Sequence, residues 1–338
     1  MATKLRIGVL STANIGTATV IPAMQQAERV EVAAIASRDE ARARDAAERL
    51  GIPKSFGTYE ALLEDPDIDA VYIPLPNHLH AEWTMAAAAA GKHVLCEKPL
   101  AMSAAQAEEM VDACNEAGVK LSEAFMYRLH PQWVMVRDIV ASGRLGTLTA
   151  VTSWFSYNNT DATNIRNIAE YGGGAVMDIG CYCINLSRML FDSEPDDVQA
   201  IVHRSADFGT DVLTSGLLRF GDAHATFTCS TAMEDYQRVH VFGTEARLEV
   251  EIPFNAPPDR RHRIFVTQGG DPPANPDVEM IETEPANQYT LQADSFAAAV
   301  LEGGDVALPN ADSIANMRVI EAVLGAGATP LATTTGSS

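Results

Sequence analysis

The first 124 residues alternate short apolar runs with longer amphipathic stretches. The apolar runs have the length and β-branched content of buried strands, and they span Leu5–Leu10, Val30–Ala36, Ala70–Ile73, His93–Cys96 and Val119–Ser122. Helices are predicted between and after them, over Ile15–Gln26, Asp39–Leu50, Tyr59–Leu63, His80–Ala90 and Ala104–Ala117. Short apolar strands separated by helices are typical of a parallel sheet with both faces covered. Residues 1–124 are therefore predicted to form a doubly wound α/β domain.

A different pattern begins after Phe125. One helix is predicted over Pro131–Ser142, because proline is favoured at a first helical position and Gly143 follows the last turn. Period-two alternation then predicts strands at Leu148–Phe155, Val198–His203, Val212–Phe220, Ala223–Cys229, Val239–Phe242, Leu248–Ile252 and Ile264–Thr267. Residues 253–263 and 269–287 are interpreted as loops, and helices are predicted near Leu291–Leu301 and Asp312–Leu324. Residues 125–330 are thus predicted to form an α+β domain with a large, mostly antiparallel sheet.

Composition and charge exclude several classes of partner. The chain has 338 residues and a formal charge of −21, which disfavours nucleic acid and anionic membranes because both require a basic face. No apolar run approaches the roughly 20 residues that cross a bilayer, and the first strand-like run is too short for a secretion signal. A cytoplasmic location is therefore expected. The five cysteines lack zinc-type spacing and are interpreted as buried free thiols, with no metal site.

The turn after the first predicted strand has the residues of a dinucleotide site. The segment Ser11-x-Ala13-x-x-Gly16 matches the Rossmann pattern G-x-G-x-x-G with two glycines replaced by small residues. Small residues let backbone N–H groups and a helix N-terminus approach a pyrophosphate. We expect the cofactor to contact five consecutive residues here: Ser11, Thr12, Ala13, Asn14 and Ile15.

The end of the second predicted strand indicates which nicotinamide cofactor is used. NAD-binding sheets usually place an acidic residue there for the ribose 2′-hydroxyl, whereas this chain has Ser37 followed by Arg38. An arginine can pair with a 2′-phosphate through its fork of donors, so NADP is favoured over NAD. Two alternatives remain open. Ser37 or Asp39 could cap the next helix while Arg38 is solvated, or Asp39 could take the ribose role.

Two further segments follow the carboxyl ends of predicted strands, where open α/β sheets bind ligands. Pro74-Leu-Pro-Asn-His-Leu-His80 comes after Ala70–Ile73, and Glu97-Lys98-Pro99 comes after His93–Cys96. A lysine between Glu and Pro at this edge is interpreted as a reactive group and not as a surface charge. Cofactor contacts are expected from six residues of these segments: Leu75, Pro76, Asn77, His80, Glu97 and Lys98.

The second half of the chain contributes a glycine-rich segment, Gly172-Gly-Gly-Ala-Val-Met-Asp178-Ile-Gly-Cys-Tyr182. Asp178 and Tyr182 are four positions apart, which places both on one face of a helix. The alternative is a capped helix start with a packed tyrosine. The presence of Lys98 favours the first interpretation, in which lysine, aspartate and tyrosine meet at one site.

These stretches together resemble the Gfo/Idh/MocA oxidoreductase family, named for glucose–fructose oxidoreductase and inositol dehydrogenase. The resemblance runs from about residue 4 to residue 325 and includes Gly8–Gly16, Pro74–His80, Glu97-Lys98-Pro99, Glu123-Ala-Phe-Met-Tyr-Arg128, Gly172–Tyr182, Gln288-Tyr289 and Asp294-Ser-Phe296. Tyr182 stands where inositol dehydrogenases have histidine. In this respect the chain resembles the branch of D-xylose 1-dehydrogenases, glucose–fructose oxidoreductases and dimeric dihydrodiol dehydrogenases.

The resemblance implies catalytic roles for Lys98, Asp178 and Tyr182. Hydride transfer belongs to the nicotinamide, and the protein must manage one proton. A free tyrosine has a pKa of about 10, which an adjacent ammonium is expected to lower. Tyr182 is therefore predicted as general acid–base, Lys98 as its electrostatic partner and substrate anchor, and Asp178 as orienter. Lys98 as the proton carrier is the alternative. Aromatic and arginine side chains give three more candidates: Arg128 toward the cofactor, and Trp154 and Arg166 toward the substrate.

The predicted activity is NADP-dependent oxidation of an aldose at C1 to a lactone. One alternative is an aldose–aldose or glucose–fructose oxidoreductase that retains its NADP. Others are reduction of a keto-sugar, oxidation of a dihydrodiol, and a dinucleotide-binding sensor without catalysis. The sheets of this family commonly pack against each other, so a homodimer or homotetramer through the C-terminal sheet is expected.

Overall fold

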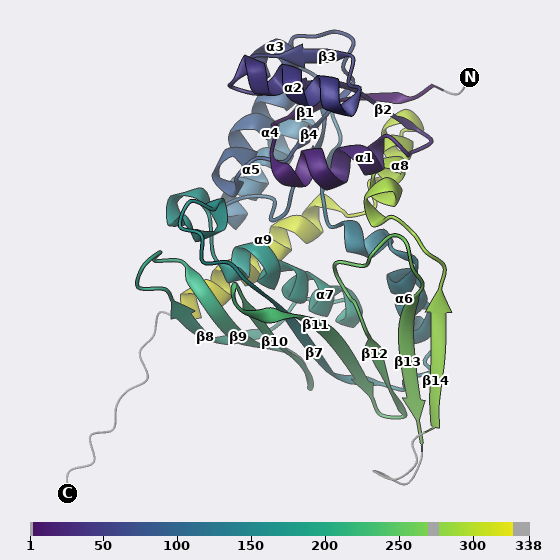
Figure 1. The fold of residues 1–338 in the computed structure, drawn as a ribbon. Helices are drawn as coiled ribbons and strands as arrows, with labels where there is room; N and C mark the ends of the chain where they lie inside the picture. The colour runs from purple at the N-terminus through teal and green to yellow at the C-terminus, as the bar shows by residue number, and fades with distance from the viewer. Residues whose placement is uncertain (1–2, 270–276, 327–338) are drawn as a thin grey trace, which may run out of the picture.

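The computed structural model describes residues 3–269 and 277–326. Figure 1 shows the purple and blue N-terminal elements in the upper part of the molecule and a broad green sheet in the lower part. The yellow helix near the end of the chain lies between these two parts. Of the helices that the structure describes, none has the length and apolar content needed to span a bilayer. The five cysteines are buried free thiols, as predicted.

The N-terminal sheet is parallel, in the order β3-β2-β1-β4-β5-β6. Its strands are β1 (Leu5–Leu10), β2 (Val30–Ala36), β3 (Lys54–Phe56), β4 (Ala70–Ile73), β5 (His93–Cys96) and β6 (Leu121–Glu123). The connecting segments are η1 (Gly16–Val20), α1 (Ile21–Met24), α2 (Glu40–Leu50), α3 (Tyr59–Leu63), η2 (Asn77–Leu79), α4 (His80–Ala89) and α5 (Ala104–Glu116). The strand order reverses between β1 and β4, so their carboxyl ends flank the crevice in which such sheets bind ligands.

The C-terminal sheet has the order β14-β13-β12-β11-β7-β10-β9-β8, and all its neighbours are antiparallel except β7 and β10. Its strands are β7 (Leu148–Asn158), β8 (Asp197–Arg204), β9 (Asp211–Phe220), β10 (Ala223–Ser230), β11 (Ala232–Gly243), β12 (Ala246–Val250), β13 (His262–Gln268) and β14 (Asp277–Thr283). Before and after β7 come η3 (Met126–Leu129), α6 (Pro131–Ala141), η4 (Ile165–Asn167), η5 (Ala169–Tyr171), η6 (Val176–Gly180) and α7 (Cys181–Phe191). Val151, Ser153 and Phe155 of β7 are buried on the face that α7 covers.

The last two helices connect the two sheets. Helix α8 (Gln288–Leu301) returns to the N-terminal sheet, where Ala293, Phe296 and Ala297 join the apolar core around β1 and β2. Helix α9 (Asn310–Ala326) packs against α5 of the first sheet and against α7 and β8 of the second. The core around the parallel sheet thus includes a helix from the end of the chain, and the carboxyl edge of this sheet is held against the second one.

The fold class predicted from the sequence is confirmed, and β1, β2, β4 and β5 have the predicted bounds. Two strands were not predicted. Strand β3 has only three residues, and β14 lies within 269–287, which we had interpreted as a loop; residues 270–276 lie outside the described part of the chain. Strand β14 is an edge strand with exposed Val278 and Met280. Because its side chains are mostly solvated, no burial pattern in the sequence distinguishes it from a loop.

Candidate active site

A cavity of about 800 Å³ lies where the carboxyl edge of the parallel sheet meets the second half of the chain. One wall comes from the loops after β1, β4 and β5, and the other from β7, from residues 159–173 and from the start of α7. Ten of the predicted site residues line this cavity: Ala13, Asn14, Ile15, Leu75, Asn77, Glu97, Lys98, Arg166, Asp178 and Tyr182.

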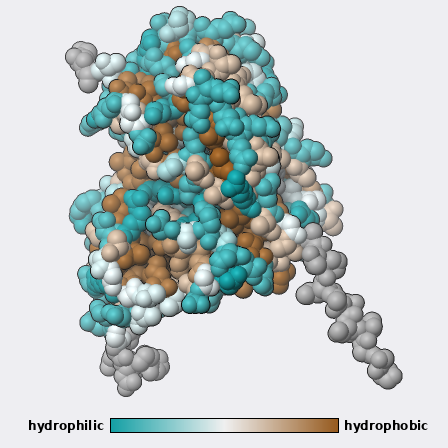
Figure 2. All heavy atoms as spheres, turned by 180° about the vertical axis from the view of Figure 1, so that it is seen from behind, coloured by the Kyte–Doolittle hydropathy of each residue, from teal (hydrophilic) through white to brown (hydrophobic). Residues whose placement is uncertain are grey.

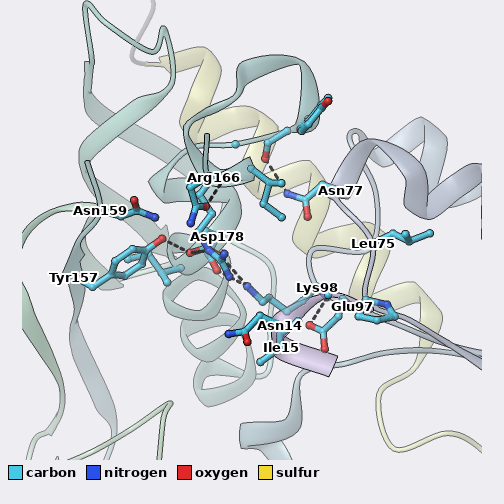
Figure 3. Close-up of a pocket in the computed structure, with 18 of the residues that line it drawn as sticks. Asn14, Ile15, Leu75, Asn77, Glu97, Lys98, Tyr157, Asn159, Arg166 and Asp178 are labelled. Atoms are coloured by element: carbon cyan, nitrogen blue, oxygen red, sulfur yellow. Dashed lines mark hydrogen bonds and ion pairs between the residues drawn. The ribbon is translucent and has the colours of Figure 1, made fainter. Parts of the chain in front are cut away.

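The Asp178 carboxylate accepts hydrogen bonds from three side chains in this cavity (Figure 3). Lys98 Nζ donates to Asp178 Oδ1 at 3.2 Å and to the Asp178 carbonyl oxygen at 2.7 Å. The other carboxylate oxygen accepts from Arg166 Nε at 2.9 Å and from the Tyr157 hydroxyl at 2.5 Å. Lys98 belongs to the parallel half and the other three residues to the antiparallel half, so one ion-paired cluster joins both walls.

Pairing sets the charge state of this cluster. Burial raises the pKa of Asp178, but the charges of Lys98 and Arg166 outweigh burial and hold it well below its ordinary value. Burial lowers the pKa of Lys98, yet Asp178 opposes this effect and the net shift is upward. Lys98 is therefore an ammonium, and Asp178 a carboxylate, at neutral pH. The predicted role of Asp178 as an orienter of Lys98 has a direct geometric basis.

Tyr182 lies in the same cavity as the lysine. Lys98 Nζ is 5.0 Å from the centroid of the Tyr182 ring, within the range of a cation–π contact. The Tyr182 hydroxyl is 3.6 Å from Met126 Sδ. Four aromatic side chains enclose the ring: Phe125, Tyr127, Phe155 and Phe254. The structure thus brings together the lysine and the tyrosine that the sequence placed in different halves of the chain.

The pKa of Tyr182 differs from the expectation drawn from the sequence. Burial raises this pKa well above its ordinary value, and Tyr289 and Glu97 raise it further. The expected lowering by Lys98 is not seen, because the ammonium lies over the ring and pairs with Asp178. In this structure Tyr182 is a neutral phenol, which can donate a proton but is a poor base.

The turn after β1 is suited to hold a pyrophosphate. Ala13, Asn14 and Ile15 line the cavity at the start of a helical segment. The N–H groups of a first helical turn have no partner within the helix and can bind an anion. Ser11 has a φ of 155°, a conformation that glycine adopts more easily than serine, and its hydroxyl accepts the Ala13 N–H at 3.0 Å. Ser11 and Thr12 lie in this turn but do not line the cavity.

The three residues after β2 have distinct environments. Asp39 caps α2, because its carboxylate accepts the N–H groups of Ala41 at 3.0 Å and Arg42 at 3.2 Å. Ser37 is buried, and its hydroxyl accepts the Asp39 N–H at 3.2 Å. Arg38 is exposed. The carboxylate of Asp39 is therefore occupied within the protein, whereas the guanidinium of Arg38 is accessible to a phosphate.

His80 does not line the cavity, contrary to the expectation of a direct cofactor contact. Its ring is wholly buried, with Nδ1 3.0 Å from the Pro99 carbonyl oxygen and Nε2 2.8 Å from the Leu75 carbonyl oxygen. His80 thus connects the loop after β4 to the loop that carries Lys98. Pro76 also lies outside the cavity lining.

Two other expected contacts do not fit this geometry. Arg128 Nη1 donates to Asp312 at 2.9 Å and to Asn185 at 3.4 Å, so Arg128 ties η3 to α9 and α7 and does not reach the cavity. Trp154 pairs in register with Arg238 of β11, on the opposite face of β7 from Phe155 and Tyr157. Successive residues of a strand point to opposite faces. The aromatic side chains of β7 that face the cavity are therefore Phe155 and Tyr157.

Sequence reasoning missed several residues of the cavity. Tyr157 is in phase with the buried residues of β7, and extending the period-two pattern by two residues would have found it. Tyr289 was part of the quoted resemblance but had no assigned role; it lies near Glu97, whose carboxylate accepts the Tyr72 hydroxyl at 2.6 Å. No local signal indicates the asparagines of the wall, which are Asn159, Asn164 and Asn255.

Two contacts between the halves lie beside the loop after β4. The Asn77 side-chain amide donates to the Gly172 carbonyl oxygen at 2.8 Å. The rings of His78 and Tyr171 stack with centroids 4.5 Å apart. Gly172 has a φ of +76°, and a Cβ atom there would lie 2.4 Å from Met102 Sδ, so only glycine fits without rearrangement. Residues 165–172 therefore reach from the Asp178 cluster to the nucleotide-facing loop.

Family models match most of the chain. A model described as "Oxidoreductase family, NAD-binding Rossmann fold" matches residues 5–125, and a "GFO/IDH/MocA C-terminal domain" model matches residues 133–249. An uncharacterised oxidoreductase of Rhizobium meliloti is 44% identical over 94% of this chain and 96% of its own. The D-xylose 1-dehydrogenase (NADP⁺) 2 of Haloferax volcanii is 43% identical, over 94% of this chain and 96% of its own.

Solved structures agree with these matches. The 3-ketoreductase from Actinomadura kijaniata, in complex with NADP and TDP-benzene, has a TM-score of 0.90 and 31% identity, covering 96% of this chain and 98% of its own. The aldose–aldose oxidoreductase from Caulobacter crescentus, complexed with glycerol, has a TM-score of 0.88 and 29% identity, covering 96% of this chain and 97% of its own. Both alignments cover 96% of this chain and therefore include both of its sheets.

Proposed function

We propose that this chain, which belongs to the Gfo/Idh/MocA oxidoreductase family, oxidises an aldose at C1 to the lactone with NADP. Like its relatives, the chain is an oxidoreductase that acts on CH–OH groups. The observation that supports the finer proposal is the Lys98–Asp178 pair above the Tyr182 ring in the cavity. The 43% identity to a D-xylose dehydrogenase supports an aldose as the substrate.

NADP is the cofactor, and the described residues fit it. The first helical turn at Ala13–Ile15 would hold the pyrophosphate, and Arg38 at the end of β2 would hold the 2′-phosphate. Glu97 and Lys98 lie at the other end of the same edge, where the nicotinamide would be placed. When bound, the nicotinamide supplies the hydride acceptor.

Arg38→Ala is expected to weaken NADP binding about tenfold or more and to leave NAD binding nearly unchanged, because hydrogen bonds to charged groups contribute about 1.5–3 kcal/mol. Fluorescence titration with each cofactor measures the effect. Arg44→Ala is the matched control, since Arg44 lies on the outside of α2 and pairs with Glu40. Equal weakening of NADP and NAD by Arg38→Ala would contradict the pairing with a 2′-phosphate.

The task of the protein side chains is to take the proton of the C1 hydroxyl. Lys98 would hold the charge that develops on the substrate oxygen, and the Tyr182 hydroxyl would exchange the proton. The Lys98–Asp178–Tyr157 hydrogen bonds form a second route, in which Lys98 itself carries the proton. Both Lys98 and Tyr182 are protonated in this structure, so one of them must lose a proton before oxidation.

The remaining cavity wall suits a neutral sugar. Its asparagine side chains, from Asn159, Asn164 and Asn255, can each donate and accept hydrogen bonds to hydroxyl groups. Among the described residues that line the cavity, the two cations, Lys98 and Arg166, are already paired with Asp178. We therefore favour an unphosphorylated aldose over a sugar phosphate.

A screen of aldoses with NADP, in which the absorbance of NADPH is followed, tests the proposed activity. Oxidation of a pentose or hexose to its lactone, with little turnover of the matching sugar phosphate, is the expected result. If only keto-sugars or dihydrodiols were turned over, the proposal of an aldose substrate would be wrong and those compounds would take its place. Tight binding of NADP with no redox change for any sugar, polyol or diol would favour a sensor instead.

The contacts beside Asn77 favour a second candidate, an aldose–aldose oxidoreductase that keeps NADP bound between turnovers. The Asn77–Gly172 hydrogen bond and the His78–Tyr171 stack cover the edge along which the cofactor would lie. A covered cofactor dissociates slowly. Slow release would let a second sugar reoxidise the bound NADPH that the first sugar has formed. Nicotinamide absorbance in the purified protein would distinguish this candidate from a simple dehydrogenase.

Asn77→Ala is expected to speed NADP release by about 3- to 10-fold, the effect of losing one hydrogen bond. Stopped-flow displacement of bound NADP measures the release rate. Asn115→Ala serves as the control, because Asn115 is exposed at the end of α5. An unchanged release rate in Asn77→Ala would remove this contact from cofactor retention.

We also propose a homodimer or homotetramer through the open face of the C-terminal sheet. This face carries the hydroxyl pairs Thr152–Thr226 and Ser215–Thr228, together with the exposed side chain of Leu217. Seen from behind, the lower half of the molecule, which holds the C-terminal sheet, also exposes apolar groups among polar ones (Figure 2). Covering an exposed sheet face with a second subunit is favourable, because it removes apolar side chains from water. The mass in solution, measured by light scattering, tests the assembly.

A further inference from the structure

Two buried titratable side chains outside the Asp178 cluster contact the loop that carries Lys98. Glu123 Oε1 accepts the Leu100 N–H at 2.8 Å, and His80 Nδ1 lies 3.0 Å from the Pro99 carbonyl oxygen. The Pro99 carbonyl and the Leu100 N–H belong to a single peptide group. This peptide, one residue beyond Lys98, is therefore held at both of its polar ends.

Glu123 reaches this peptide from the end of β6. It pairs in register with Cys96 of β5, so its side chain starts beside the point where the Lys98 loop leaves the sheet. Glu123 is 2% exposed, and its Oε2 atom has no hydrogen-bond partner among the described residues. A glutamine could accept the same N–H without placing a charge in the core. Unlike glutamine, the carboxyl group of Glu123 can ionise.

We propose that Glu123 is a positioning residue for Lys98: it orients the Pro99–Leu100 peptide and thereby directs the Lys98 ammonium toward Asp178. The inference rests on the function proposed above, because that function assigns Lys98 to the reaction. A carboxylate accepts a stronger hydrogen bond than a neutral carboxyl group does. The peptide is therefore held most firmly when Glu123 is ionised.

The surroundings of Glu123 place its ionisation near neutrality. Burial raises its pKa to about 7, while the hydrogen bond from the Leu100 N–H opposes the rise. Two charged groups face it, Asp312 of α9 and Arg188 of α7, and these are paired with each other at 3.0 Å. The carboxyl group is charged above this pKa and neutral below it, so Lys98 should be held less firmly as the pH falls below about 7.

Glu123→Gln and Glu123→Ala test this role through the pH dependence of kcat. Glutamine keeps an acceptor oxygen and the volume but never ionises, whereas alanine removes the contact. We expect a step in the wild-type profile near pH 7 that is absent from Glu123→Gln. In Glu123→Ala, kcat should fall about tenfold or more with little change in the KM for NADP, because small displacements of a catalytic group are costly.

A second measurement does not depend on turnover. Acetic anhydride labels exposed amines, and peptide mass spectrometry gives the labelling rate of Lys98 in wild type and in both variants. Faster labelling of Lys98 is expected in both variants, with Lys120 labelled at the wild-type rate as the internal control. If wild type oxidises no sugar but Lys98 labelling still responds, the proposed function fails and the positioning role stands. The Glu123→Gln variant conserves the side-chain volume. If it shows unchanged labelling of Lys98 and an unchanged pH profile, the positioning role of Glu123 is wrong.

Discussion

Lys98→Met is expected to lower kcat for aldose oxidation by about 10²-fold or more. Methionine nearly preserves the length of the side chain but removes the ammonium that pairs with Asp178 at 3.2 Å. Asp178 keeps its hydrogen bonds from Arg166 and Tyr157, so the cavity should remain folded. The affinity for NADP, measured by fluorescence titration, should change far less than kcat.

The control for this variant is Lys4→Met. Lys4 is exposed, and its Nζ atom donates to the carbonyl oxygens of Ala27 and Val30, at 3.5 and 3.4 Å. A lysine lost at that position should leave kcat unchanged. Wild-type turnover in Lys98→Met would mean that the ion pair with Asp178 is structural and that the proposed proton chemistry is wrong.

Tyr182→Phe is expected to lower kcat by a similar factor, about 10²-fold or more. Phenylalanine keeps the ring that packs among four aromatic side chains and lies beneath Lys98. It removes only the hydroxyl, whose partner in the structure is Met126 Sδ. Since that contact is weak, the melting temperature should hardly change, and the loss should appear in kcat with NADP affinity preserved.

The two variants together decide which group carries the proton. If Tyr182→Phe keeps most of the turnover and Lys98→Met loses it, the Lys98–Asp178–Tyr157 route is the better account. Tyr236→Phe, at an exposed tyrosine of β11, is the control for loss of a phenol. Because Lys98 and Tyr182 both begin protonated, the rate of oxidation should rise with pH in wild type until one of them is deprotonated.

Much of the nucleotide half could be predicted because its signals are local. Strands β1, β2, β4 and β5 are buried along most of their length on both faces, so they appear as largely apolar runs in the sequence. Gly51, Gly91 and Gly118 follow helices with positive φ, as their positions after helical patterns indicate. The residues at the strand ends, including Lys98, then follow from the rule that parallel strands present one carboxyl edge.

The substrate wall was harder to predict because its residues meet only through tertiary contacts. Trp154 and Tyr157 both lie in β7, and the choice between them depends on which face of the strand α7 covers. Arg128 is the last residue of a motif that resembles the family. Its guanidinium pairs with Asp312, which is 184 residues away in the chain. No periodicity in the sequence reports such a pairing.

By itself, the sequence of this protein determined two sheets and a dinucleotide edge, because residue type and local spacing are enough for these. Together with the family resemblance, it predicted a lysine, an aspartate and a tyrosine as the reactive set. Only the tertiary structure decided the charge states and the partners. It places the ammonium over the Tyr182 ring, gives Asp178 three donors and puts Glu123 behind the Lys98 loop. The physical reason is that burial and pairing, which set pKa values and orientation, arise from segments far apart in the chain.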